Sequence, residues 1–212
     1  MTKLPWPKRG DKAFAPADDG KYFHLPKQAY LYLPQHADAF QLAAEMILDA
    51  HLESDSRFNH DELIFPVAYL YRHCIELQLK RIIDYGRKLD LLEDSEKLQE
   101  VIGGHNLAKL WTRAKFVINA HWEDAEQNSP KAVEAIINEF HQVDPNGQVF
   151  RYSRDKDNKP HQYEGMPSST DVANLRDTMA GVLNFFGGCI DGLDHSLEAM
   201  MDMQRDMRDN YY

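Results

Sequence analysis

The sequence predicts an all-α fold, a bundle of about five helices in a chain of 212 residues. Two observations carry this prediction. Most of the chain consists of long segments in which apolar side chains recur every three to four residues, as they do along one side of a helix. Proline and glycine gather between these segments, and after residue 34 strand-like segments occur only within residues 149–166.

The first 34 residues are expected to form an arm rather than a long helix. They contain five prolines, which would interrupt a helix, and six aromatic residues. So many aromatic side chains indicate that the arm packs on the rest of the protein. Residues 29–33 are expected to form a short strand or extended segment.

Residues 35–212 are expected to form the helical domain. The predicted helices span residues 35–53, 61–89, 107–123, 129–142 and 171–208, with a bend in the last helix at Gly187–Gly188 and a partly helical connection at 91–102. Asp61, Asn106 and the segment 168–171 have the side chains of helix N-caps. Residues 144–168 form an irregular insertion that begins with a turn at 144–147.

Within this insertion, residues 149–153 and 162–166 are expected to pair as a β-hairpin around the turn at 157–160.

The segment 61–89 is the helix around which we expect the bundle to be organised. Its apolar side chains cover most of the circumference, which is typical of a central helix. One strip is charged instead, with Arg72, Glu76 and Lys80 at successive i+4 steps and His73 beside them. This strip either faces water or forms a polar site between helices. In the second case a cation from another segment must neutralise Glu76.

Composition and charge exclude several classes of protein. The net charge of −10 at pH 7 disfavours a general nucleic-acid coat or an anionic membrane as partner, but it allows a small basic site. Cys74 and Cys189 lack zinc-site spacing and lie in apolar helical segments, so we expect buried free thiols rather than a disulfide. No segment is typical of a secretion signal or membrane span. These observations predict a cytoplasmic protein.

Two segments together resemble the HEPN superfamily (higher eukaryotes and prokaryotes nucleotide-binding domains). They are RHxxELxLK from Arg72 and GHNL from Gly104, and the resemblance covers residues 62–111 best. HEPN proteins are small helical bundles that are usually dimeric. Many are ribonucleases of toxin and antiviral defence systems, and others are inactive partners of nucleotidyltransferases. The resemblance implies a HEPN-like homodimer that acts on RNA or binds a nucleotide, RNA or a protein, without a cofactor.

Active members of this superfamily carry an arginine followed, after a few residues, by a histidine. The matching pair here is Arg154 and His161, with six residues between them. The resemblance implies that Arg154 clamps the phosphate and that His161 exchanges a proton with the ribose 2′-hydroxyl, without a metal. The context differs from the family pattern, because the family's motif adjoins helices and this pair lies in a proline-containing turn.

The segment 151–161 carries four basic residues against two aspartates. Arg151, Lys156 and Lys159 would bind RNA phosphates, and Tyr152 would stack on a base. The alternative is an exposed, solvated hairpin without a ligand. Because apolar residues flank Arg151, we also expect it to reach Glu76 and dock the insertion on the central helix.

Three further patterns leave alternatives open. His105, before a helix, is either a hydrogen-bonded structural histidine or a functional one. The pairs His73/Glu76 and His195/Glu198 have the spacing of metal ligands on a helix, which would suit a metal-dependent bundle enzyme. The sequence thus leaves three functional hypotheses: a ribonuclease first, a non-catalytic binding module second and a metal-dependent enzyme third.

The last helix carries small residues along one side. They mark either tight packing inside the bundle or a dimer seam, and a methionine stripe continues beyond them and favours self-association. The residues concerned are Gly181, Gly188, Gly192, Met200, Met203 and Met207.

Overall fold

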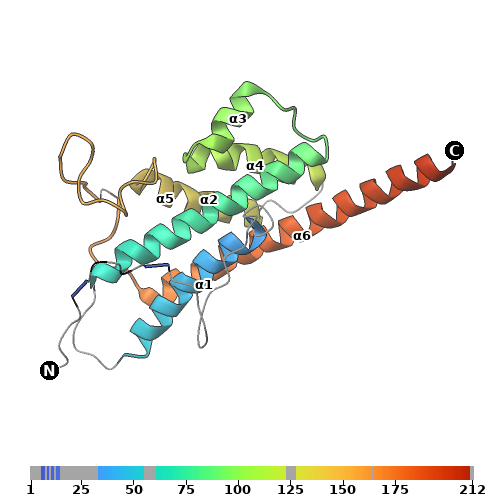
Figure 1. Ribbon diagram of the computed structural model, residues 1–212. Helices are drawn as coiled ribbons and strands as arrows, with labels where there is room; N and C mark the ends of the chain where they lie inside the picture. The colour runs from blue at the N-terminus through green and yellow to red at the C-terminus, as the bar shows by residue number, and fades with distance from the viewer. Residues whose placement is uncertain are drawn as a thin grey trace. The chain divides into compact units, whose positions relative to one another are not determined.

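A computed structural model describes residues 6–7, 9, 11, 13–14, 33–54, 61–122, 128–163 and 165–210. The regular secondary structure of these residues is entirely helical, which confirms the predicted all-α class (Figure 1). The elements are α1 (Leu33–Leu52), the 3₁₀-helix η2 (Asp61–Leu63), α2 (Ile64–Lys88), α3 (Glu96–Gly103), α4 (Leu107–His121), α5 (Asn128–Val143) and α6 (Val172–Asn210).

The chain divides into two units, Met1–Tyr32 and Leu33–Tyr212. Nearly all of the predicted N-terminal arm lies outside the described residues, including the extended segment expected at 29–33 up to Tyr32. Helix α1 already begins at Leu33, slightly before the predicted start of the helical domain.

Helix α2 is the central helix of the Leu33–Tyr212 unit, as predicted. Helices α1, α4 and α6 all pack against it (Figure 1). Its apolar side chains are buried on several sides, and each fully buried Ile or Leu contributes about 1.5–3 kcal/mol relative to exposure. The fully buried large side chains of this helix are Tyr71, Ile75, Leu79, Ile82 and Ile83.

Side-chain caps set several helix boundaries. The Asn106 side chain accepts a hydrogen bond from the Lys109 amide (2.9 Å), and Asp171 accepts one from the Asn174 amide (2.9 Å), so both predicted caps are confirmed. Asp61 begins a 3₁₀ turn instead, and α2 starts after it without a side-chain cap. Part of the expected connection at 91–102 is the regular helix α3.

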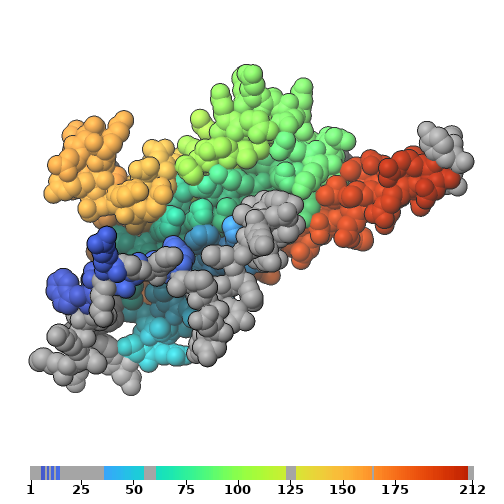
Figure 2. Space-filling view, viewed as in Figure 1, coloured from blue at the N-terminus to red at the C-terminus, as the bar shows by residue number. Residues whose placement is uncertain are grey.

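Helix α6 continues without interruption through Gly187 and Gly188, the predicted point of a bend. Gly192 is in close packing, because an added Cβ would lie 2.6 Å from Trp122 Cζ2. Gly181 and Gly188 instead face open space. The last buried side chain of α6 is Leu193, and residues 201–209 are exposed where the helix extends past its neighbours (Figure 2). The dimer seam stays a prediction.

The predicted β-hairpin of the insertion is not formed by the described residues. One isolated antiparallel bridge joins Arg154 and Pro160, and the amides of Arg151 and Tyr152 both donate to Gln148 O at 3.1 Å. The Asp144 carboxylate explains this difference. Its Oδ1 accepts hydrogen bonds from the amides of residues 148 (2.6 Å) and 149 (3.1 Å), which curls the chain into turns before a strand can begin.

The two cysteines are buried free thiols, as predicted. Burial raises the pKa of Cys74 to about 12 and that of Cys189 to about 11. Among the described residues, none of the helices combines the length with the apolar composition that a membrane span needs.

Candidate functional site

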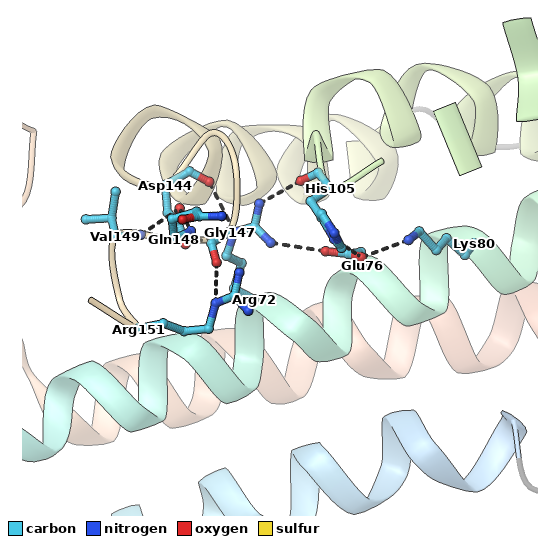
Figure 3. A network of polar contacts seen from close by, with 9 residues as sticks. All are labelled: Arg72, Glu76, Lys80, His105, Asp144, Gly147, Gln148, Val149 and Arg151. Atoms are coloured by element: carbon cyan, nitrogen blue, oxygen red, sulfur yellow. Dashed lines mark hydrogen bonds and ion pairs between the residues drawn. The ribbon is translucent and has the colours of Figure 1, made fainter. Parts of the chain in front are cut away.

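A buried polar network lies along one side of α2 (Figure 3). Arg72 is 2% exposed and Glu76 is 3% exposed, and Arg72 Nη1 donates to Glu76 Oε2 at 3.2 Å. At Arg72 and Glu76, therefore, the charged strip forms a buried polar site rather than a solvated face.

Arg72 joins three segments of the chain. Its Nε donates to the carbonyl oxygen of Asp144 (3.1 Å) and lies 3.2 Å from the Asp144 carboxylate, which is fully buried after α5. Its Nη2 donates to the carbonyl oxygen of His105, just before α4, at 2.7 Å. One guanidinium thus ties the start of α4 and the end of α5 to the central helix, using the fork geometry that lysine lacks.

Arg72 and Lys80 neutralise Glu76, and His105 adds a contact from another segment of the chain. Glu76 Oε1 accepts a hydrogen bond from Lys80 Nζ at 2.8 Å and lies 2.9 Å from His105 Nδ1. Burial raises the pKa of Glu76, but the hydrogen bonds from Lys80 and His105 outweigh burial and leave the pKa below its ordinary value. Glu76 is therefore held as a carboxylate beneath the surface.

The predicted pair of Arg151 with Glu76 is wrong. Arg151 Nε donates to the carbonyl oxygen of Gly147 at 2.6 Å, and its guanidinium lies 5.6 Å from the ring centroid of Tyr69. Arg72 docks the insertion instead. Gly147 packs on it with φ of +72°, and an added Cβ would lie 2.9 Å from Arg72 Nη1, so glycine suits this position on both grounds.

His105 and Lys80 carry the network to the surface. The His105 side chain is 58% exposed and the Lys80 side chain 23% exposed, whereas the Glu76 side chain between them is 4% exposed. The contact with Glu76 occupies Nδ1 of His105 and leaves Nε2 for another partner. The structural reading of His105 is supported by this hydrogen bond, and its exposure keeps the functional reading open.

His73 lies apart from this network. Its ring packs edge-on against Phe40, with centroids 4.5 Å apart, and stacks with Tyr69 at 5.8 Å. Burial lowers its pKa. No group of three or more His, Cys, Asp or Glu residues within the described ranges is arranged to hold a metal ion.

Residues 151–161, which we call the basic turn, form a compact loop whose residues 151–160 are all exposed. Asp155 Oδ1 accepts hydrogen bonds from the amides of Asp157 (2.9 Å) and Lys159 (2.8 Å), and Asn158 adopts φ of +62°. These local bonds order the turn from within. Lys156 and Lys159 make no ion pair with any described residue.

The predicted catalytic pair lies within this turn. Arg154 Nη1 donates to the carbonyl oxygen of Asn158 at 2.8 Å, so its guanidinium is bound by its own loop. His161 pairs with Ser153 through its backbone amide (3.1 Å), and its Nε2 is buried without a hydrogen-bond partner. Catalysis by Arg154 and His161 stays a prediction.

Sequence reasoning missed Asp144, which it placed only in a turn. A carboxylate directly after an amphipathic helix and before Pro145 was the available signal, but nothing in the sequence linked it to Arg72. Searches against family models, curated proteins and solved structures returned no significant match for this chain. The HEPN resemblance accordingly depends on the residue pattern from Arg72 and Gly104.

Proposed function

We propose that the protein is a HEPN-like RNA-binding protein whose phosphate-binding element is the basic turn. One observation carries the proposal: exposed cations project from a loop that is ordered by its own hydrogen bonds and is anchored to the central helix. The anchor runs from Arg72 to Asp144, and the contact of the Arg151 guanidinium with the Tyr69 ring on α2 adds to it.

An ordered turn favours binding because little conformational entropy remains to be lost. Lys156 and Lys159 can contact successive phosphates, and Tyr152, 55% exposed, offers a ring face to an unpaired base. The acidic remainder of the chain repels RNA, so we expect binding that is sensitive to salt. Single-stranded RNA is the expected form, since its bases are free to stack.

The binding test uses fluorescence anisotropy with a labelled single-stranded RNA over a range of salt concentrations. The variant Lys156→Gln/Lys159→Gln should weaken binding and reduce the slope of log K against log salt by about 1.4, which is about 0.7 for each lost phosphate contact. The matched control Lys97→Gln/Lys131→Gln removes the same charge from exposed positions on α3 and α5. Equal effects of both variants would contradict the proposal.

A second candidate function is metal-independent RNA cleavage, and the Glu76–His105 contact favours it. A carboxylate at 2.9 Å from Nδ1 orients an exposed imidazole for proton transfer, and Lys80 adds a cation at the same carboxylate. Such a reaction needs a base for the 2′-hydroxyl and a positive charge near the phosphorane. Arg154 and His161 are the alternative pair, on the HEPN resemblance.

The cleavage test measures RNA degradation in the presence of a chelator. The variants are His105→Gln, which retains a donor for Glu76, and His161→Gln and Arg154→Gln. Loss of cleavage in His105→Gln alone would assign proton transfer to the Glu76–His105 pair, and loss in the other two variants would assign it to the HEPN motif. If the wild-type protein binds RNA without cutting it, the ribonuclease hypothesis is contradicted and the RNA-binding hypothesis remains.

A further inference from the structure

A cavity of about 770 Å³ lies where α1 ends and where α2 and α6 begin, next to Tyr163 and the segment 166–170. Its volume falls in the range of about 300–1,000 Å³ that is typical of small-molecule sites. The residues that line it include neither Arg72, Glu76 nor His105, so it is distinct from the polar network on α2.

Aromatic and aliphatic side chains form most of the cavity wall. Phe65 from α2 and Tyr163 from the insertion lie 5.3 Å apart between ring centroids, tilted by 41°, and Phe150 also lines the cavity. Aromatic rings carry negative charge on their faces, so a wall of this kind attracts a cation as well as an apolar group.

Two acidic side chains, Asp61 and Glu62, also line the cavity. His51 and Tyr163 are the other titratable residues of the wall, and the described lining contains no lysine or arginine. A carboxylate or phosphate ligand would therefore meet two acidic side chains and no lysine or arginine. A ligand with a positive charge would meet the Asp61 carboxylate and ring faces together.

We propose that this cavity binds a small organic cation, an ammonium group carried on an apolar body. The aliphatic wall takes the body, and the aromatic faces with the Asp61 carboxylate take the charged head. An alkylated ammonium suits such a site better than a primary one, because it has less hydration to lose. This proposal is independent of RNA binding, which involves the outer surface of the basic turn.

The test is isothermal titration of the full chain with 4-phenylbutyl-trimethylammonium. There are two comparison probes. The neutral analogue with a tert-butyl head keeps the shape and removes the charge, and 4-phenylbutyrate carries a negative charge on a similar apolar body. The cation should bind saturably with one site per chain, and both comparison probes should bind at least about threefold more weakly, the lower limit expected for a cation on an aromatic face.

Two variants assign the site. Tyr163→Leu removes a ring face, and Asp61→Asn removes the charge at an exposed position; each should weaken binding of the cation by about three- to thirtyfold. Phe116→Leu on α4 and Asp191→Asn on α6 make the same changes at exposed positions outside the cavity and should leave binding unchanged. The proposal is overturned by absence of saturable binding, by equal binding of the neutral analogue, or by equal effects of site and control variants.

Discussion

Replacing Arg72 by methionine tests whether the network on α2 holds the fold together. The variant removes the ionic partner of the fully buried Asp144 and one of the partners of Glu76. It also leaves the carbonyl oxygens of His105 and Asp144 without the donors that they have in the native protein. The methionine fills similar space, so the loss is mainly electrostatic.

The expected cost follows from burial. Removing one partner of a buried ion pair costs about 3–5 kcal/mol, because the remaining charge stays away from water without compensation. For a chain of this size, each kcal/mol lowers the melting temperature by about 2–4 °C, which predicts a decrease of about 6–20 °C. Arg72→Lys should fall between wild type and Arg72→Met, since lysine keeps the charge and loses the fork.

The measurement is urea unfolding followed by circular dichroism, with the slope m compared between variants. Arg87→Met is the matched control on the same helix. Arg87 is 30% exposed and pairs with the exposed Asp94 at 2.6 Å, so its replacement should cost about 0–1 kcal/mol. If Arg72→Met loses no more stability than Arg87→Met, the network does not stabilise the fold and the reasoning is refuted.

Three further predictions concern stability and reactivity. Gly86→Ala should destabilise the protein by about 1–3 kcal/mol in urea unfolding, because its Cβ would lie 2.3 Å from a valine methyl group on α4. Gly188→Ala meets open space and should stabilise the helix by about 0.5–1 kcal/mol in the same assay. The opposite order of stabilities would contradict this packing. Cys74 and Cys189, with pKa values raised to about 12 and 11, should react with a disulfide reagent at neutral pH only slowly until urea unfolds the protein, and fast labelling of the native chain would contradict their burial. The pKa of Glu76 in the folded protein is lower than its ordinary value of 4.5, so ionised Glu76 stabilises the fold. This stabilisation is fully present above pH 4.5 and is lost as the pH falls through the folded-state pKa. The difference in unfolding free energy between wild type and Glu76→Gln should therefore shrink with acidification, and a constant difference would count against the pairing.

The fold was largely predictable because helical periodicity is a property of each segment. The apolar pattern of 61–89 identified α2 as central, and the side chains of Asn106 and Asp171 marked the starts of α4 and α6. These features depend on residues within a few positions of one another, so no knowledge of the tertiary contacts was needed.

The candidate site was predictable only in part. The i+4 spacing of Arg72, Glu76 and Lys80 placed three of its charges on one side of a helix, and two of the partners, Lys80 and His105, are among the residues that the sequence singled out. The choice of Arg151 as the partner of Glu76 failed, because several cations were compatible with the sequence and only geometry distinguishes them.

Tertiary structure alone decided where the insertion attaches. Arg72 and Asp144 are far apart in the chain, and their contact exists because α2 and the end of α5 are brought together by the packing of the bundle. Once there, the buried carboxylate accepts hydrogen bonds from the Gln148 amide and from the amide of Val149, the first residue of the predicted hairpin. Helices depend on hydrogen bonds and side chains that are close in the sequence, so the sequence alone predicts them. A buried charge pairs with the opposite charge that the folded chain places beside it, so its partner depends on the whole fold.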